Sequence, residues 1–342
     1  MRRRFIHHFG LFILLTSIGC GARGTGMIYV SNERSDNITV IDPHTLQTAK
    51  TIAVGKRPRG IHLSSDGKRL YVALSGTPIG GPNVKDEDLP PSDKKADGIA
   101  VIDTKTGKLL EKIPGGSDPE QFSLSRDERY AFASNEDDAS LAVVSLADRR
   151  VVDSIKVGTE PEGVTTSPDG KFIYVTSETS NDVHVFDAKS FTIVGHVKTA
   201  QRPRSVAFTP DGKKAFVACE SGEAITVIDA VSKTVTGQIN MPVKGYRPMG
   251  TVVSADGKKL YVTTGRGGAV VVISTATDKI TAVVKHVGDR PWGVALSNDG
   301  KWLYTANGPS NDITIIEVKS NKIQTHVKAG TSPWGVAVDG GR

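Results

Sequence analysis

The stretch PEGVTTSPDGKFIYVTSETSNDVHVFDAKSFTIVGHVKT, residues 161–199, holds one complete structural unit of this 342-residue chain. A short alternating run follows the first proline, and the turn SPDGK separates it from a second run, FIYVTS. A polar segment then leads into VHVFD and finally into TIVGHVKT. β-Branched residues dominate and no helical period is present, so the unit predicts four β-strands. Asp-Gly favours a tight hairpin, because Asp bonds to the nearby backbone and Gly adopts a positive φ.

The same order of runs recurs along the chain, and each unit starts at a proline inside an x-Pro-x segment. The seven prolines are Pro58, Pro119, Pro161, Pro203, Pro248, Pro291 and Pro333. Their spacings are 61, 42, 42, 45, 43 and 42 residues. A period of about 42 residues is typical of a four-stranded propeller blade. The sequence therefore predicts an all-β, seven-bladed β-propeller, with small residues after each proline on a crowded innermost strand.

The first and last parts of the repeat region complement each other. Residues 27–55 supply the second, third and fourth strands of a blade, whereas residues 333–339 (PWGVAVD) supply a first strand alone. We predict that they form one composite seventh blade, which closes the ring without an open sheet junction. The span 27–342 is then a single domain. The segment 76–97 is an insertion of 22 residues in the first complete blade.

The first 22 residues have the features of a secretory signal. MRRR is followed by FGLFILLTSIG, an apolar run too short to span a bilayer, and then by CGA. This order favours cleavage after Ala22. A second interpretation is lipoprotein processing at Cys20, although Ser17 stands where that motif usually has Leu; a third is that residues 1–22 are a retained membrane anchor. Either cleavage predicts a periplasmic or extracellular protein, free or attached through a lipid.

Charge and motif content exclude several classes of function. The formal charge is +6, and three of these charges lie in the leader, so the remainder is too weakly basic to predict nucleic-acid binding. After cleavage only Cys219 remains, which excludes an intramolecular disulfide and predicts a buried, small apolar residue. The chain contains no C-x-x-C-H haem motif, no G-x-S-x-G nucleophile elbow and no phosphate-cradling glycine loop.

The residues that flank the prolines form an ordered ring. In an up-and-down blade, the loop entering the first strand and the loop joining the second and third strands emerge on one face. The x-Pro-x segments and the insertion 76–97 therefore share that face, and variable loops on a rigid frame usually carry recognition. The candidate ligand- or partner-binding residues at this channel mouth are Arg57, Arg59, Glu120, Glu162, Arg202, Arg204, Arg247, Arg290, Trp292 and Trp334.

This ring has two interpretations. As a binding mouth, its arginines would hold carboxylates and its two tryptophans would stack on a planar ligand, or the same residues would anchor a protein partner. Alternatively, Arg59–Glu120 and Glu162–Arg204 are salt bridges between neighbouring blades, and the tryptophans plug the channel. We favour the second interpretation for the charged pairs, because crowded charges are usually paired.

Metal ligands are weakly represented. We expect the six histidines beyond the leader to fall on separate blades: His44, His62, His184, His196, His286 and His326. No H-x-H or H-E-x-x-H spacing occurs, so we predict no metal site; His62, on an innermost strand, is the one weak candidate and is better explained as a core histidine. Six loop acids lack the spacing of a calcium loop and are interpreted as solvated charge: Glu136, Asp137, Asp138, Glu178, Asp182 and Glu220.

Blade-specific motifs carry a resemblance to known families. GKRPRGI, SDPEQFSL, NEDD, TEPEGV, SETSNDVHVFD, QRPRSVAFTPDGK and SPWGVAV occur in this order. With the repeated LYVxx…N…VxVID pattern, the chain resembles the YVTN family of bacterial β-propellers. More closely, it resembles the propeller family associated with pyrroloquinoline-quinone-dependent alcohol catabolism, although the insertion 76–97 is not a feature of that family.

The resemblance implies a non-enzymatic, exported binding or scaffold protein that accompanies quinoprotein alcohol oxidation. It implies association with pyrroloquinoline quinone systems rather than a tightly bound cofactor. We expect a monomer that binds a protein partner or a small anionic ligand, binds no nucleic acid, and meets the membrane only through a lipid anchor. The alternative is an enzyme, such as a lactone hydrolase or a dehydrogenase subunit, because the same fold serves both.

Overall fold

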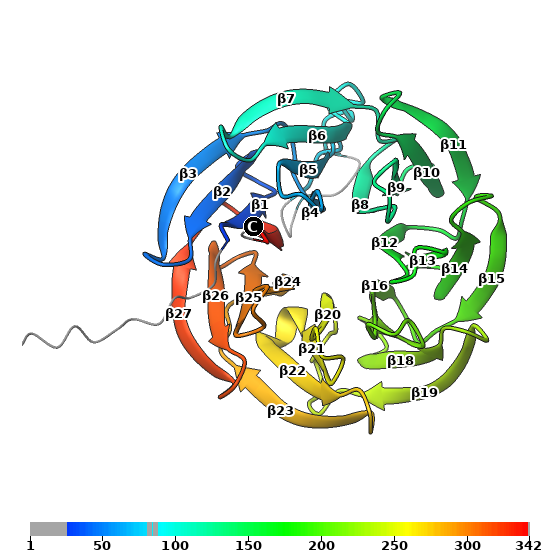
Figure 1. The fold of residues 1–342 in the computed structure, drawn as a ribbon, viewed down its shortest axis with the longest axis vertical. Helices are drawn as coiled ribbons and strands as arrows, with labels where there is room; N and C mark the ends of the chain where they lie inside the picture. Colours follow the sequence, from blue (N-terminus) through cyan, green and yellow to red (C-terminus); the bar gives the residue numbers. More distant parts are fainter. Residues whose placement is uncertain (1–25, 81–83, 85–87, 341–342) are drawn as a thin grey trace, which may run out of the picture.

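The fold is a ring of seven four-stranded antiparallel sheets, as Figure 1 shows. The computed structural model describes residues 26–80, 84 and 88–340. Within these residues the secondary structure is almost entirely β-strand, and η2 (Gly265–Gly267) is a short 3-10 helix. The prediction of an all-β, seven-bladed propeller is therefore confirmed.

The blades are numbered from the first complete repeat, and their strands run outward from the central axis. Blade 1 consists of β4 (Ile61–Leu63), β5 (Arg69–Leu74), β6 (Gly98–Asp103) and β7 (Lys108–Ile113). Blade 2 consists of β8 (Pro119–Leu124), β9 (Tyr130–Asn135), β10 (Ser140–Ser145) and β11 (Arg150–Lys156). Blade 3 consists of β12 (Pro161–Thr166), β13 (Phe172–Ser177), β14 (Asp182–Asp187) and β15 (Ile193–Lys198). Blade 4 consists of β16 (Pro203–Phe208), β17 (Lys214–Cys219), β18 (Ala224–Asp229) and β19 (Thr234–Asn240). Blade 5 consists of β20 (Thr251–Val253), β21 (Lys259–Thr263), β22 (Ala269–Ser274) and β23 (Lys279–Lys285). Blade 6 consists of β24 (Pro291–Leu296), β25 (Trp302–Asn307), β26 (Asp312–Glu317) and β27 (Lys322–Lys328). Blade 7 consists of β28 (Pro333–Val338), β1 (Ile28–Asn32), β2 (Asn37–Asp42) and β3 (Gln47–Ala53).

Blade 7 combines strands that are far apart in the sequence. Its sheet order is β28-β1-β2-β3, and β28 pairs antiparallel with β1 so that Tyr29 lies opposite Ala337. The pairing continues where the amide of Asp339 donates to the carbonyl of Met27 at 3.0 Å. Trp334, on β28, is thereby held on the innermost strand of this blade.

The hydrophobic core lies between blades rather than inside them. Each of the seven buried clusters draws its side chains from two adjacent blades; in one of them Tyr29 of blade 7 packs with Leu70 and Val72 of blade 1. The second and third strands of each blade are therefore almost wholly buried, as in β1, whereas outermost strands such as β3 are mostly exposed. Burial on both faces explains why those middle strands read as continuous runs of Val, Ile and Ala.

The innermost strands are crowded against one another around the axis. A Cβ at Gly163 would lie 2.3 Å from the carbonyl oxygen of Arg204, and one at Gly293 would lie 2.5 Å from that of Trp334. Only glycine permits backbones to approach so closely. The prediction that small residues after each proline mark an innermost strand is confirmed, and the flanking side chains are consequently gathered around a common opening.

The predicted Asp-Gly turns occur between the first and second strands. Gly67, Gly170 and Gly300 have φ values of 68°, 75° and 67°. The carboxylate of the preceding Asp accepts bonds from inside the turn, as when Asp169 Oδ1 accepts from Ser167 Oγ at 2.7 Å. These turns match the geometry that the sequence predicted.

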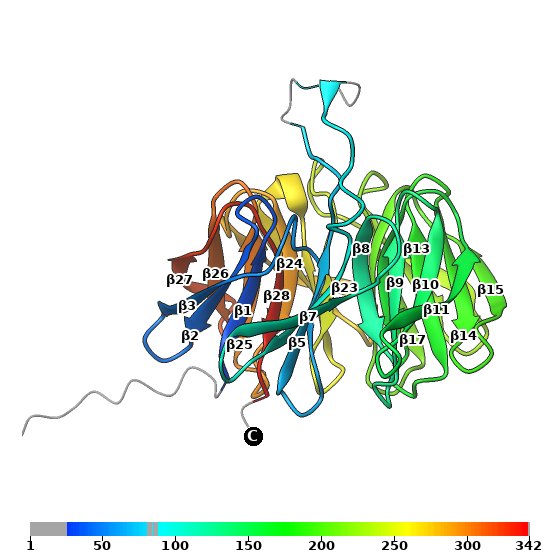
Figure 2. The same cartoon turned by 90° about the horizontal axis from the view of Figure 1, so that it is seen from above.

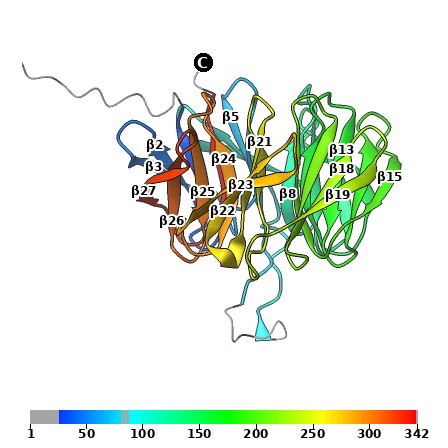
Figure 3. The same ribbon diagram turned by 90° about the horizontal axis from the view of Figure 1, so that it is seen from below.

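The insertion extends from the face of the propeller that carries η2, as Figures 2 and 3 show from two sides. Its base is tied to the body and to itself: Lys56 Nζ lies 2.8 Å from Asp93 Oδ2, and the hydroxyls of Thr77 and Ser92 are 2.8 Å apart. The predicted leader 1–22, with Cys20, lies outside the described residues. In the part of the chain that the structure does describe, no helix has the length and apolar character needed to cross a bilayer.

Candidate functional site

A central cavity of about 210 Å³ opens on the axis of the ring, and the innermost strands of all seven blades line it. Four of the predicted site residues contribute to its wall: Glu162, Arg204, Trp292 and Trp334. His62 also lines it. The channel mouth, defined here as the x-Pro-x segments around this opening, is thus a real concavity.

The backbone before most of the repeat prolines has an uncommon conformation that shapes the mouth. Six of the seven residues preceding a repeat proline have left-handed φ values between 43° and 61°: Arg57, Asp118, Glu160, Arg202, Arg290 and Ser332. Non-glycine residues adopt this region rarely, at a cost of about 1 kcal/mol or more. The turn separates the side chain before the proline from the one after it, which belongs to the first strand.

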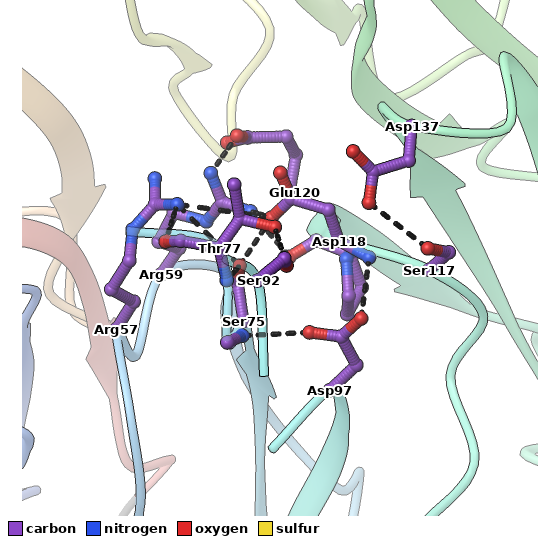
Figure 4. Close-up of polar contacts among 12 residues, drawn as sticks. Arg57, Arg59, Ser75, Thr77, Ser92, Asp97, Ser117, Asp118, Glu120 and Asp137 are labelled. Atoms are coloured by element: carbon purple, nitrogen blue, oxygen red, sulfur yellow. Dashed lines mark hydrogen bonds and ion pairs between the residues drawn. The ribbon is translucent and has the colours of Figure 1, made fainter. Parts of the chain in front are cut away.

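A first group of buried charges joins blades 1 and 2 (Figure 4). Arg59, which is 1% exposed, contacts Asp118 Oδ1 at 2.6 Å and also pairs with Glu120. Burial opposes ionisation of Asp118, but the neighbouring Arg59 and Arg57 hold the pKa of this carboxyl below its usual value. Arg57 itself pairs with Glu33 at 3.0 Å. The predicted Arg59–Glu120 salt bridge is confirmed, and it is part of a larger cluster.

The insertion is anchored to this first group. Arg57 Nη1 donates to the carbonyl of Thr77, and Asp97 Oδ2 accepts from the amide of Asp118 at 3.0 Å (Figure 4). Lys94 pairs with Asp137. The prediction that the insertion and the x-Pro-x segments share a face is therefore confirmed.

A second group of charges joins blades 3 and 4. Arg204, whose side chain is 11% exposed, contacts Glu162 at 3.1 Å and Glu220 at 2.8 Å, and it also pairs with Glu178. Arg202 lies 2.5 Å from Glu178. The predicted Glu162–Arg204 bridge is confirmed. The expectation that the loop acids are solvated is wrong for Glu178 and Glu220, which are buried because they neutralise these arginines.

The two tryptophans meet edge to face. Their ring centroids are 5.9 Å apart at an interplanar angle of 83°, so they do not form a parallel clamp. The guanidinium of Arg290 lies 5.3 Å from the centroid of Trp292, and that of Arg204 lies 6.0 Å from it. Such contacts orient an arginine over an aromatic face.

Arg290 differs from the other arginines at the mouth. Within residues 26–80, 84 and 88–340 it makes no ion pair, and it is exposed. Burial and then the positive charge of Arg266 lower its pKa, with Glu220 opposing. Arg247 reaches only to 3.9 Å from Glu220. The side of the mouth formed by blades 5 and 6 thus carries positive charge that side chains of the described residues leave largely uncompensated.

Glu136, which the sequence placed only among the loop acids, interacts electrostatically with the charged residues of the mouth. Burial, then the negative charges of Glu162 and Asp118, raise its pKa to about 7, and Arg59 opposes them. No ion pair involves Glu136 in the described part of the chain. Its place in the NEDD motif, next to the buried end of β9, was the available signal.

His62 lies on β4, is partly buried, and contributes to the wall of the central cavity. It packs edge to face on Phe122, with ring centroids 4.8 Å apart, and burial lowers its pKa to about 4, although bonds with Gln121 and the Phe122 backbone oppose the shift. The imidazole is therefore neutral near pH 7. Cys219 is 0% exposed, as expected for a structural thiol.

The expectation that the histidines fall on separate blades is wrong. His184 on β14 and His196 on β15 are direct cross-strand partners, with ring centroids 4.6 Å apart. Asp182, interpreted as a solvated loop acid, is 2% exposed and lies beside both rings. The hairpin register, which motif spacing does not capture, brings them together.

Comparisons with known proteins support the fold and leave the activity open. The Cytochrome D1 heme domain family model matches residues 92–209, about a third of the chain. Antigen Lp49 of Leptospira interrogans is 32% identical over 139 residues, which cover 32% of this chain and 30% of that protein's length. Because each match is partial, neither assigns a family.

Two solved structures show how widely this architecture is used. Hydrazine synthase of Kuenenia stuttgartiensis superposes with a TM-score of 0.70 at 22% identity, covering 83% of this chain and 90% of that one. A periplasmic gluconolactonase of Pseudomonas aeruginosa gives 0.72 at 19% identity, covering 92% and 99%. At such identities the likeness concerns the fold alone.

Proposed function

We propose that the protein is a non-enzymatic binding protein of the periplasm or cell exterior that captures a planar organic anion at the channel mouth, in the service of quinoprotein-dependent alcohol oxidation. The ordered motifs from GKRPRGI to SPWGVAV and the leader 1–22 support this setting, with Cys20 as the alternative point of lipid attachment. Pyrroloquinoline quinone, a planar aromatic carboxylate, has the chemistry that the mouth would recognise.

The observation that carries the proposal is the position of Arg290. Arg59 and Arg204 are surrounded by carboxylates, so an incoming anion would have to displace an existing ion pair to reach either of them. Arg290 has no such partner in the described residues, is exposed, and lies over Trp292 at the cavity rim. A carboxylate on Arg290 would hold a planar ligand beside the aromatic ring.

The size of the opening limits how such a ligand binds. The cavity of about 210 Å³ is smaller than the 300–1,000 Å³ that is typical of ligand pockets. A ligand with several fused rings would therefore insert one edge and rest the remainder on the mouth. The edge-to-face tryptophans offer one ring face at the rim rather than a slot between two rings.

Titration calorimetry with pyrroloquinoline quinone tests the proposal. We expect Arg290→Ala to weaken binding by about tenfold or more, the value of one charge-assisted contact. Arg150→Ala is the matched control, because Arg150 is an exposed arginine at the start of the outermost strand β11 and makes no ion pair in the described residues. Equal affinities in the two variants, or no binding by the unaltered protein, would contradict the proposal.

A second candidate function is hydrolysis of a lactone, which is supported by the fold shared with a periplasmic gluconolactonase and by the position of Glu136 near Glu162 and Asp118. A carboxyl group with a pKa of about 7 is suited to act as a general base near neutral pH. The Glu136 carboxylate would accept a proton from a water molecule while the water oxygen attacks the lactone carbonyl carbon. The bond between the carbonyl carbon and the ring oxygen then breaks, and the ring oxygen takes a proton, giving a hydroxy acid. Turnover of gluconolactone that is lost in Glu136→Gln and kept in Arg290→Ala would favour this function over capture.

A further inference from the structure

Blade 3 contains a cluster of side chains that belongs to neither function proposed above. Asp182 and His184 lie two residues apart on β14, so they project from the same face of the sheet. The register pairs Asp182 with Lys198 and His184 with His196 on β15. Four polar side chains are therefore brought together on one face of a single hairpin.

We infer that Asp182, His184 and His196 form a binding site for a divalent first-row transition metal ion. Asp182 Oδ1 lies 3.4 Å from His184 Nδ1, and Asp182 Oδ2 lies 2.7 Å from His196 Nε2. One donor atom from each residue lies within 4.8 Å of the others. A tetrahedral zinc ion with bonds of about 2.0–2.1 Å places its ligand atoms about 3.3 Å apart. His196 is half exposed, so its side chain is free to rotate into that geometry.

Two buried atoms of the cluster lack hydrogen-bond partners. The Asp182 side chain is 4% exposed, and its Oδ1 accepts no hydrogen bond within the described residues. His184 Nδ1 is likewise buried and without a hydrogen bond there. Buried polar atoms are nearly always satisfied, and leaving one unsatisfied costs about 1–3 kcal/mol. The two atoms lie 3.4 Å apart, which is close to the separation of two ligand atoms on one tetrahedral ion.

Blade 6 provides an internal comparison, because it has the same Asp, His and Lys at the matching positions. There Asp312 pairs with Lys328 and Thr314 pairs with His326 in the register of β26 and β27. Asn307 donates to Asp312 Oδ1 at 2.7 Å and to Thr314 Oγ1 at 2.9 Å. The polar atoms of blade 6 are therefore satisfied by one another.

Blade 3 departs from this arrangement at two positions. Ser177 stands where blade 6 has Asn307, and its shorter side chain leaves Oγ without a hydrogen bond in the described residues. His184 stands where blade 6 has Thr314, which places a second imidazole in the cluster. Blade 3 therefore lacks the side-chain amide that donates to the aspartate in blade 6, and it has an additional imidazole that can bind a metal ion.

The ligand types define the class of ion. Two imidazoles and one carboxylate suit zinc, nickel, copper or iron, whereas calcium and magnesium prefer oxygen ligands alone.

Lys198 Nζ, 2.9 Å from Asp182 Oδ2, occupies part of the space that an ion would use. Its side chain is 70% exposed, so it can move into solvent when an ion binds.

The test uses the full chain without an affinity tag, treated with chelator and then titrated with Zn²⁺, and in parallel with Co²⁺ followed by visible absorption. We expect one ion per chain and affinities weaker by about tenfold or more in His184→Thr, which copies blade 6, and in His196→Ala. His326→Ala is the matched control in blade 6 and should bind as the unaltered protein does. His196 is on an outer strand, so its variant should keep the fold, which circular dichroism checks. Absence of stoichiometric binding, or equal loss in His326→Ala, would overturn the assignment.

Discussion

Replacing Arg59 by Met is the sharpest test of how the mouth is held together. The substitution keeps most of the apolar volume of the side chain and removes its charge. Arg59 is 1% exposed and pairs with Asp118 at 2.6 Å and with Glu120 (Figure 4). Both carboxylates are themselves buried, with Asp118 3% and Glu120 6% exposed, so they would lose their main partner where water compensates them poorly.

The expected cost follows from the burial of these charges. Removing one partner of a buried ion pair typically costs about 3–5 kcal/mol, because the remaining charge is left uncompensated. Unfolding entropy is about 2.1 cal/mol/K per residue, or about 0.65 kcal/mol/K for the roughly 310 described residues. The melting temperature should therefore fall by about 5–8 °C.

Thermal unfolding followed by circular dichroism measures this shift. Arg69→Met is the matched control: its pair with Asp103 has a similar length, 3.0 Å, but the arginine side chain is 41% exposed, so the loss should be below about 1 kcal/mol. The folded-state pKa of Asp118 is depressed, so its contribution to stability is present above pH ~4 and is lost as the pH falls further. The difference in melting temperature between the unaltered protein and Arg59→Met should accordingly become smaller below pH ~4. Equal shifts in Arg59→Met and Arg69→Met would refute the reasoning.

Three further outcomes are expected. The pKa of Glu136 is raised to about 7, so its ionisation destabilises the fold as the pH rises from about 4 towards 7; Glu136→Gln should raise the melting temperature at pH 8 and change it little at pH 5, and an equal change at both would contradict this. Gly163→Ala would place a Cβ 2.3 Å from the Arg204 carbonyl oxygen and should cost about 1–3 kcal/mol in urea unfolding; a neutral result would mean that blades 3 and 4 separate easily. Lys198→Met removes a cation 2.9 Å from Asp182, so it should tighten Zn²⁺ binding in the titration described above, and weaker binding would count against that site.

The fold could be predicted because its signals are local and repeated. A proline starts every blade, and an Asp-Gly turn ends the first strand of most of them, although blade 2 has Asp127-Glu128 instead. These signals fix the start and the first hairpin of the unit. The Arg59–Glu120 and Glu162–Arg204 pairs could also be predicted, since residues after successive prolines must lie on adjacent innermost strands. The third carboxylate on Arg204, from Glu178, could not, because the direction of a loop side chain depends on the turn conformation.

The repeat unit 161–199 already contains both His184 and His196, so the expectation of separate blades conflicted with the repeat itself; a β-bulge decides whether the two rings meet. Between Val185 and Phe186 the register of β14 against β15 shifts by one residue. If the pairing of Phe186 with Ile193 continued without a bulge, His184 would lie opposite Gly195. His196 would then lie on the opposite face of the sheet from His184. A one-residue slip exchanges the faces of a strand, so the bulge decides whether the two imidazoles meet. Motif spacing carries no information about this irregularity.

One turn of blade 3 supports both the channel mouth and the proposed metal site. Glu178, at its start, binds Arg202 and Arg204 at the mouth, and Asp182, at its end, begins the strand that carries the metal ligands. Asn181 stiffens the same turn, since its side-chain oxygen accepts from the amide of Arg202 at 2.8 Å and its own amide donates to Glu178 at 3.2 Å. A bound ion that fixed Asp182 would therefore act on the segment that orients Glu178. By linkage, any effect of the ion on capture at the mouth must be matched by an equal effect of the captured ligand on the affinity for the ion.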